Sequence, residues 1–225
     1  MGKLALGYGS EWHLLRLLGR HQQFLNGEIM EVIGFGADID WLVFGFGGNG
    51  EDKELKGLNF LTHPAYESVL RAWQEFWPQT GQAQNWDAVG WLVGRTTPEL
   101  LLVEAKAHTG ELLSSCGAGE RSKLTIENAF AAVKSDLGVP QGADWLNQYY
   151  QEANRLAVLW FLTKYGIPAR FVTLCFCGDT HANADCPSVE AGWGPALALQ
   201  AKHLELPFNH SLSDRVHKVF LNVNG

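Results

Sequence analysis

The sequence contains no uninterrupted hydrophobic run long enough to cross a lipid bilayer. Its longest apolar runs have the length of one β-strand or are broken by Arg and Glu, whereas a transmembrane helix needs about 20 consecutive apolar residues. No segment has the charged start and apolar middle of a signal peptide. Internal repeats and low-complexity segments are also absent. We therefore expect a cytoplasmic protein with no membrane partner.

Cysteine is scarce, and its spacing includes no CxxC pair. The four cysteines are Cys116, Cys175, Cys177 and Cys186. This pattern indicates neither a zinc site nor a disulfide framework. Cys175 and Cys177 fall on one face of an apolar segment, so we interpret them as free thiols of the core, which fits a reducing cytoplasm.

Basic residues are fewer than acidic ones: the sequence has 17 Lys and Arg and 24 Asp and Glu, which gives a net charge of −7. Phosphate contacts normally come from a basic surface, so this balance disfavours a large, free-standing nucleic-acid-binding face. A local basic patch or a bound divalent cation is still compatible with a nucleic-acid partner. The 225 residues and 46% hydrophobic content fit one α/β domain over residues 1–225.

The most informative stretch consists of two apolar runs, 86–93 and 100–105, on either side of a polar break at 94–98. Strand residues flanking a short segment of Gly, Thr and Pro predict a β-hairpin. The second run is apolar at Leu100, Leu101, Leu102 and Val103 without alternation. Such a strand is covered on both faces, so we expect it at the centre of the sheet.

Three charged residues meet in this hairpin if its turn is centred between Arg95 and Thr96. Paired positions then sum to 191, which places Asp87 directly opposite Glu104. Because side chains alternate between faces, Lys106 shares the face of Glu104. Two carboxylates held close together repel, and partial burial increases the cost. The sequence therefore predicts a cation-binding site at the end of the hairpin.

Asp87 followed by Glu104-Ala105-Lys106 resembles the signature of the PD-(D/E)xK nuclease superfamily, which has the restriction-endonuclease-like fold. The resemblance covers a couple of dozen residues closely and the rest of the chain in element order alone. Trp86 stands where the family motif has proline. The resemblance implies an α/β fold with a mixed central β-sheet flanked by helices. It also implies a divalent-metal-dependent nuclease whose substrate is nucleic acid, DNA in the first place.

In that reading Asp87, Glu104 and the backbone carbonyl of Ala105 hold Mg²⁺ or Mn²⁺, which prefer hard oxygen ligands. Lys106 orients the attacking water or neutralises charge that develops on the phosphate. A glutamate of the first helix often completes the metal site in the family, and Glu11 matches this role best. Glu11 is equally explained as an acid that favours the helix dipole.

Other candidates for the site are weaker. Glu28 and Glu31 are alternative acids, while Asp38 and Asp40 are also explained by turn chemistry. Arg16 lies one turn from Arg20 and is a candidate phosphate contact or a solvated residue. His108 shares the face of Lys106 if the strand continues. Gln151 and Arg155 lie one turn apart on a strongly apolar helix, where they are candidate phosphate or metal-water contacts or an ordinary exposed face.

Periodicity and turn residues predict the remaining elements. Ser10 is expected to cap a first helix whose apolar spacing continues to Leu25. The other expected helices are 64–77, 125–137, 144–165 and about 195–204, and the other expected strands are 40–46, 169–177 and 216–223.

Two further functions are compatible with the sequence. One is a non-catalytic accessory or DNA-binding protein of a DNA-processing or defence system that retains the nuclease fold. A homodimer or a larger complex is compatible with this function and with the nuclease alike. The other is a metal-independent protein-interaction module in which the motif is a coincidence. A titration with divalent metal distinguishes both from an enzyme.

Overall fold

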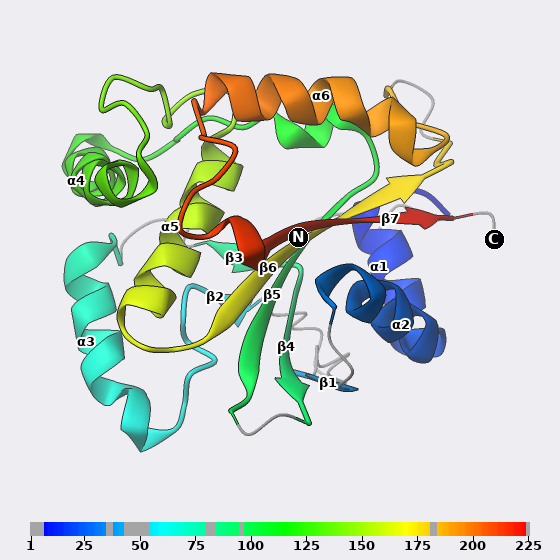
Figure 1. Ribbon diagram of the computed structural model, residues 1–225, viewed down its shortest axis with the longest axis horizontal. Helices are drawn as coiled ribbons and strands as arrows, with labels where there is room; N and C mark the ends of the chain where they lie inside the picture. The colour runs from blue at the N-terminus through cyan, green and yellow to red at the C-terminus, as the bar shows by residue number, and fades with distance from the viewer. Residues whose placement is uncertain are drawn as a thin grey trace.

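The computed structural model describes residues 7–34, 38–42, 55–79, 84–94, 97–180 and 184–223. Its centre is a five-stranded sheet in the order β1-β4-β5-β6-β7. These strands are β1 (Asp38–Trp41), β4 (Ala88–Val93), β5 (Glu99–Lys106), β6 (Ala169–Cys177) and β7 (Val216–Asn222). The pairs β1–β4 and β4–β5 are antiparallel, whereas β5–β6 and β6–β7 are parallel. The predicted mixed sheet flanked by helices is confirmed (Figure 1).

The hairpin and its register are also confirmed. Ala88 pairs with Val103 and Val89 with Leu102, so that paired numbers sum to 191. β5 lies between β4 and β6 at the centre of the sheet, and seven of its eight residues are buried. The first apolar run is shorter than expected as a strand of this sheet. Its Trp86 belongs instead to β3 (Asn85–Trp86), which pairs with β2 (Leu55–Lys56) in a separate two-stranded sheet.

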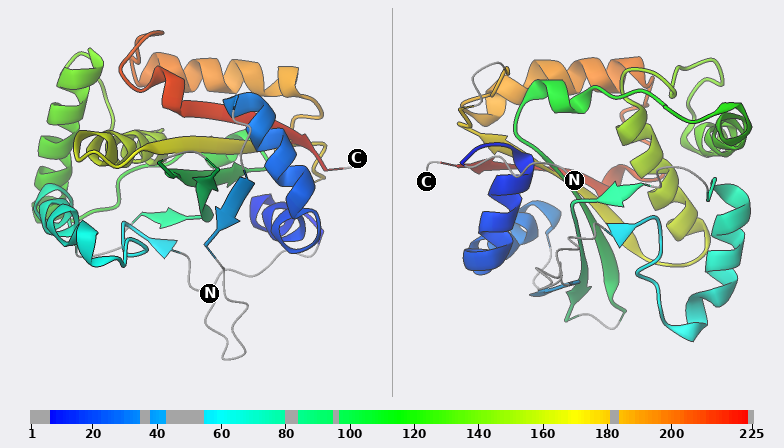
Figure 2. Two further views of the ribbon diagram at one scale, coloured as in Figure 1. Left: turned by 60° about the horizontal axis from the view of Figure 1, so that its bottom comes forward. Right: turned by 180° about the vertical axis from the view of Figure 1, so that it is seen from behind.

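Helices cover both faces of the central sheet (Figures 1 and 2). α1 (Ser10–Arg20) and α2 (Gln22–Ile33) pack on one face, and α3 (Glu67–Phe76) lies on the opposite side. The connection from β5 to β6 supplies η2 (Thr109–Leu112), α4 (Glu120–Leu137) and α5 (Tyr150–Lys164). The connection from β6 to β7 supplies α6 (Glu190–His203) and η3 (Ser213–Arg215). Such helical crossovers are what parallel neighbours require.

The alternation of side chains along β5 decides which residues face α5. Leu101, Val103 and Ala105 belong to the core beneath α1 and α2. Leu100 and Leu102 belong to the core that includes α4 and α5. Because the period of a strand is two, Glu104 and Lys106 point to the same side as Leu100 and Leu102, toward α5.

The first predicted helix differs from the structure in two respects. Ser10 is the first residue of α1 and Gly9 its cap, because the Ser10 hydroxyl donates to Glu111 Oε1 instead (3.1 Å). The chain leaves helical geometry at His21, so the expected single helix to Leu25 is two helices, α1 and α2. Leu25 nevertheless packs in the same core as Leu14 and Leu17, which explains why the spacing resembled one helix.

The expected helix 144–165 begins six residues late, at Tyr150. Asp144 Oδ1 accepts hydrogen bonds from the N–H groups of Leu146 and Asn147, a local turn that competes with helix formation. Gln148 then has a φ of 61°, which is outside helical geometry. The long approach to α5 is therefore a turn.

The other elements differ at their ends. α4 and α6 each begin five residues before their predicted starts, with Pro195 inside α6. The helix expected at 64–77 is present as η1 (Pro64–Tyr66) followed by α3. β6 has the predicted bounds, and β7 ends one residue early. β1 starts at Asp38 instead of residue 40, and the end of the predicted strand 40–46 lies outside the described residues. Cys175 and Cys177 are buried free thiols, as expected.

Candidate functional site

Asp87 lies at the junction of the two sheets. The small-sheet strand β3 ends at Trp86 and β4 begins at Ala88, so the chain bends at Asp87 between them. The bend leaves the Asp87 side chain beside β5, where its Oδ2 accepts a hydrogen bond from the N–H of Ala105 (2.8 Å). The described residues give Asp87 no further hydrogen bond and no ion pair. The half-buried carboxylate therefore continues the hydrogen-bond ladder between β4 and β5 with Oδ2, and among the described residues Oδ1 has no hydrogen-bond donor.

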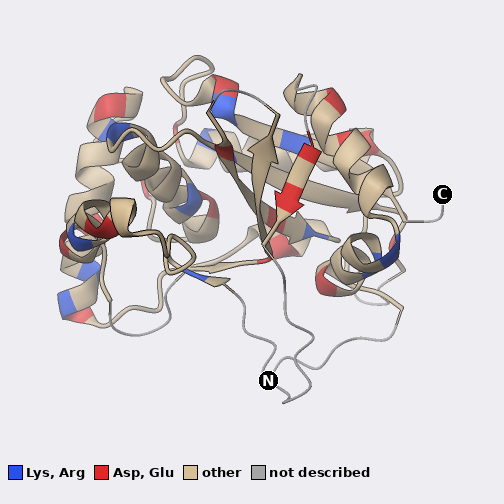
Figure 3. Cartoon of the chain, turned by 90° about the horizontal axis from the view of Figure 1, so that it is seen from below, with Lys and Arg blue, Asp and Glu red and all other residues tan. Residues whose placement is uncertain are grey.

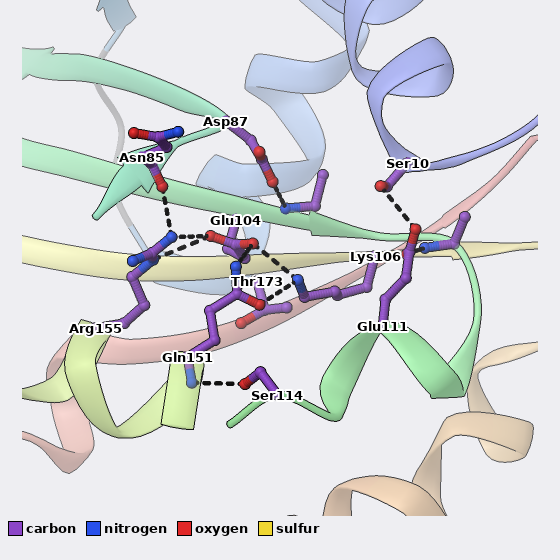
Figure 4. A network of polar contacts seen from close by, with 12 residues as sticks. Ser10, Asn85, Asp87, Glu104, Lys106, Glu111, Ser114, Gln151, Arg155 and Thr173 are labelled. Atoms are coloured by element: carbon purple, nitrogen blue, oxygen red, sulfur yellow. Dashed lines mark hydrogen bonds and ion pairs between the residues drawn. The ribbon is translucent and has the colours of Figure 1, made fainter. Parts of the chain in front are cut away.

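Glu104 is the hub of a buried network (Figure 4). Its Oε1 accepts hydrogen bonds from Lys106 Nζ (2.8 Å) and Gln151 Nε2 (2.5 Å). Its Oε2 accepts from Arg155 Nε (3.0 Å) and Nη2 (2.8 Å). The exposed fractions of Glu104, Lys106 and Arg155 are 4%, 8% and 3%. Four donors thus fill the acceptor positions of this carboxylate.

Lys106 is held between β5 and α5. Its Nζ donates to Glu104 Oε1 and to Gln151 Oε1 (2.7 Å). Gln151 is fixed in turn because its backbone N–H donates to Ser114 Oγ (2.8 Å), which ties the first turn of α5 to the segment after η2. The ammonium group therefore has a defined position that depends on the docking of α5 against the sheet.

Arg155 has partners of its own besides Glu104. Its Nη1 donates to Asn154 Oδ1 (2.7 Å) and its Nη2 to the carbonyl of Asn85. The guanidinium also lies over the ring of Trp86, 4.5 Å from the ring centroid, a favourable cation–π geometry. Arg155 therefore joins α5 to the small sheet as well as to β5.

The two carboxylates have opposite pKa shifts. Burial alone would raise the pKa of Glu104, but the charges of Arg155 and Lys106 and the hydrogen bonds outweigh it and lower this pKa below its usual range. Burial, and after it the charge of Glu104, raise the pKa of Asp87 to about 7, against smaller lowering effects of Lys106, the Ala105 N–H and Arg155. Both cations pair with Glu104, so Asp87 has the less compensated charge.

This asymmetry predicts a pH-dependent effect of Asp87→Asn on stability. The folded state binds the Asp87 proton with a pKa of about 7, whereas an unfolded aspartate has a pKa of about 3.9. The folded state therefore binds more protons between these values, and ionisation of Asp87 lowers the free energy of unfolding as the pH rises from about 4 to about 7. The amide of Asp87→Asn does not ionise, so the variant does not lose this free energy. The difference in free energy of unfolding between Asp87→Asn and wild type should therefore increase by a few kcal/mol from about pH 4 to about pH 7 and stay constant at higher pH.

Urea unfolding in chelator, at constant ionic strength between pH 4.5 and 8.5, measures the difference. Glu75→Gln, which neutralises an exposed carboxylate of α3, should give no such slope. If the difference in free energy of unfolding between wild type and Asp87→Asn is the same at every pH, ionisation of Asp87 does not destabilise the fold and the prediction is wrong.

A third ion pair, Lys218–Glu152, lies beside the network on the same face of the sheet. Thr173 on β6 pairs with Glu104 on one side and Lys218 of β7 on the other. Lys218 Nζ donates to Thr173 Oγ1 (2.8 Å) and to Glu152 Oε1 of α5 (2.9 Å). The polar groups thus form a row across β5, β6 and β7 beneath the first turn of α5.

The remaining sequence candidates lie outside this network. Glu11 is exposed in the first turn of α1, and no contact among the described residues joins it to Asp87 or Glu104. Arg16 donates to the carbonyl of Val223 (3.1 Å) and so ties α1 to the end of β7. His108 follows the end of β5, half-buried, with Nε2 3.7 Å from Glu111 Oε1. Glu28 and Glu31 are on α2, and Asp38 and Asp40 are on the edge strand β1, which β4 separates from β5.

Sequence reasoning missed several residues that position the site. Asn85, Trp86 and Ser114 hold Arg155 or Gln151 through contacts between distant segments, so no spacing signal identifies them. Asn154 holds its neighbour Arg155. Glu111 had a weak signal, since it follows Lys106 closely. It accepts from the Ala107 N–H and from Ser10, and so fixes the chain just beyond β5.

The donor set fits a hard divalent cation in its chemistry. Two carboxylates and a main-chain carbonyl are the oxygen ligands that Mg²⁺ and Mn²⁺ prefer, and Asp87 is a half-buried carboxylate with an open oxygen and a raised pKa. The described residues contain no group of three or more His, Cys, Asp or Glu side chains that would hold a metal by itself. A cation at this site would therefore be held by Asp87, Glu104, the Ala105 carbonyl and water.

Figure 3 shows Lys and Arg intermixed with Asp and Glu on the helices and strands, and the net charge of the sequence is −7. Along the described parts of the chain, every helix is too short or too polar to cross a bilayer. Comparison with protein-family models, curated proteins and solved structures gives no match.

Proposed function

We propose that this protein is a divalent-metal-dependent hydrolase of phosphodiester bonds in nucleic acid, with DNA as the first substrate to test. One observation carries the proposal. The hairpin register brings Asp87 beside the strand that bears Glu104 and Lys106. Asp87 accepts a hydrogen bond from the N–H of Ala105, the residue between them, while Glu104 and Lys106 are bonded to each other in the buried network. Burying carboxylates and a lysine in fixed positions costs desolvation free energy. Such clusters of perturbed charged groups are therefore typical of functional sites.

The topology supports the same reading. An antiparallel unit of β1, β4 and β5 is followed by a helical crossover to the parallel strand β6, with α1 and α2 before the sheet. This order fits the mixed, helix-flanked sheet that the PD-(D/E)xK resemblance implies. Asp87 directly precedes β4, and Glu104-Ala105-Lys106 ends β5, so these residues lie at the same end of the central hairpin. This agrees with the motif of Asp, a short strand and turn, and Glu-x-Lys.

Each residue has a defined role in this proposal. Asp87, Glu104 and the carbonyl of Ala105 would hold Mg²⁺ or Mn²⁺. When bound, such an ion stabilises negative charge on the phosphate and lowers the pKa of a water ligand. Lys106, held by Glu104 and Gln151, orients the attacking water or donates to the phosphate oxygens as their charge grows.

Cleavage assays on the purified full chain test the proposal. Single-stranded and double-stranded DNA and RNA are incubated with Mg²⁺, with Mn²⁺ or with a chelator. We expect products from at least one substrate with Mg²⁺ or Mn²⁺, and none with the chelator. Asp87→Asn should abolish the activity because it removes the carboxylate that has an open oxygen. Asp214→Asn, the same change at an exposed residue of η3, should leave it intact.

Cleavage that continues undiminished in chelator would contradict the metal dependence. Equal activity of Asp87→Asn and wild type would remove Asp87 from the mechanism and with it the resemblance on which the proposal is built.

A second candidate is a non-catalytic accessory or DNA-binding protein that keeps the nuclease fold. The observation in its favour is the saturation of Glu104, whose oxygens already accept four hydrogen bonds. A folded wild type that cleaves none of the four substrates in either metal would favour this candidate. Gel-shift assays on the same nucleic acids would then identify its ligand.

A further inference from the structure

The two cations of the site are distributed unevenly between its two acids. Lys106 and Arg155 both form ion pairs with Glu104 (2.8 Å each), while from the described residues Asp87 receives one backbone hydrogen bond on Oδ2. With Asp87 ionised, the four charged groups sum to zero. A divalent ion added to this arrangement would leave a buried cluster with an excess of two positive charges, and a cation bound through both acids must also share Glu104 with groups that already occupy it.

Glu104 Oε2 is the oxygen at which this competition takes place. Oε1 accepts from two different side chains, Lys106 and Gln151. Oε2 accepts from a single side chain, because both Nε and Nη2 of Arg155 converge on it. Displacing Arg155 alone therefore frees a whole carboxylate oxygen, whereas freeing Oε1 would disturb Lys106 and Gln151 together.

Arg155 can also give up this oxygen at reduced cost, because the rest of its contacts do not involve Glu104. Nη1 keeps Asn154 Oδ1, Nη2 keeps the carbonyl of Asn85, and the guanidinium keeps its place over Trp86. A buried cation that loses its only counter-ion is strongly destabilised, but three remaining contacts lessen that penalty.

We infer that Arg155 is the built-in counter-ion of Glu104, which competes with the divalent cation for Oε2 and thereby sets the affinity of the site. This inference rests on the proposed function, since it concerns the same cation. In this inference Arg155 acts on the cation site through Glu104 and not through a contact with the substrate. In the absence of metal it keeps Glu104 neutralised, and cation binding displaces it from Oε2.

Calorimetric titration of the full chain with MnCl₂ tests the competition. Arg155→Gln removes the charge and should bind Mn²⁺ about tenfold more tightly or better, equivalent to about 1.4 kcal/mol. Arg155→Lys keeps the charge and should stay within about threefold of wild type, a range of less than about 1 kcal/mol. Arg170→Gln is the matched control, because Arg170 pairs with Glu99 in the other Arg–Glu bridge of the described residues (2.7 Å), and its affinity should equal that of wild type.

The outcomes separate this inference from the function. If wild type binds Mn²⁺ and Arg155→Gln binds it equally or more weakly, Arg155 supports Glu104 and does not compete, so the inference is wrong while the function stands. If Arg155→Gln and Arg155→Lys increase the affinity for Mn²⁺ equally, the size of the side chain and not its charge limits binding. This result also overturns the inference. If no variant binds Mn²⁺, the inference and the metal-dependent function both fail.

A measurement on wild type covers the case in which Arg155→Gln does not fold. The Nε–H resonance of Arg155 is followed by ¹⁵N NMR during titration with diamagnetic Mg²⁺. We expect the resonance to shift and its exchange with water to accelerate as Oε2 is taken by the cation. A resonance that stays unchanged at saturating Mg²⁺ would overturn the inference without any variant.

Discussion

Replacing Lys106 with methionine is expected to lower the rate of metal-dependent phosphodiester cleavage by about 10²–10³-fold, the range for loss of one preorganised donor. Methionine keeps most of the apolar stem of lysine but cannot donate a hydrogen bond or carry charge. Lys106 is not one of the proposed metal ligands, so the affinity for Mn²⁺ should be retained or increased. The loss should therefore appear in kcat at saturating metal, measured under single-turnover conditions.

Lys123→Met is the control for this experiment, because Lys123 is an exposed lysine of α4. Circular dichroism and the melting temperature verify that both variants are folded before rates are compared. Full cleavage activity in folded Lys106→Met would eliminate the catalytic role of the ammonium group. Loss of Mn²⁺ binding together with activity would show that Lys106 acts through the geometry of Glu104.

Replacing Glu104 with glutamine is expected to have the largest effect on stability. The change leaves Lys106 and Arg155, which are 8% and 3% exposed, as two buried cations around a neutral amide. Breaking a buried ion pair by removing one partner typically costs about 3–5 kcal/mol. We expect a loss of that size in the free energy of unfolding, measured by urea denaturation in chelator at pH 8.

A double variant, Glu104→Gln with Arg155→Gln, identifies the source of the loss. If unpaired charge is responsible, the double variant should be more stable than Glu104→Gln alone, which gives a large coupling energy in the cycle. Glu99→Gln at the partly exposed pair with Arg170 should cost about 1 kcal/mol or less. A Glu104→Gln variant within 1 kcal/mol of wild type would contradict the structural role of the network.

The central hairpin could be predicted from sequence because its information is local. The polar break at 94–98 predicts the position of the turn, and the unbroken run before Glu104 indicates a central strand. The observed pairing of β4 with β5 agrees with this register. The bounds of strand 169–177 were likewise predicted from local sequence, because an apolar run ends there at a glycine. The pairing of Asp87 with the Glu104 strand followed from arithmetic on this register.

Features that depend on contacts between distant segments could not be derived in the same way. Arg155 and Gln151 appeared as polar residues on an apolar helix, but their direction toward Glu104 follows from how α5 docks on β5. The start of α5 was predicted too early because Asp144 forms a turn that competes with the helix. The third-ligand role of Glu11 stays a prediction, whereas Arg16 ties α1 to β7.

The crossover between β5 and β6 has a consequence for how the protein acquires its fold. The bond between Asp87 and Ala105 spans 18 residues, but those from Gln151 and Arg155 to Glu104 span 47 and 51. Contacts of high sequence separation form later, because closing a longer loop costs more entropy before the contact stabilises it. A chain that has formed the hairpin without docking α5 holds two carboxylates with Lys106 as the one cation of the network. Water screens these charges until α5 docks. Docking then buries Glu104 in the same step in which it supplies Gln151 and Arg155 as partners, which makes completion of the fold more cooperative.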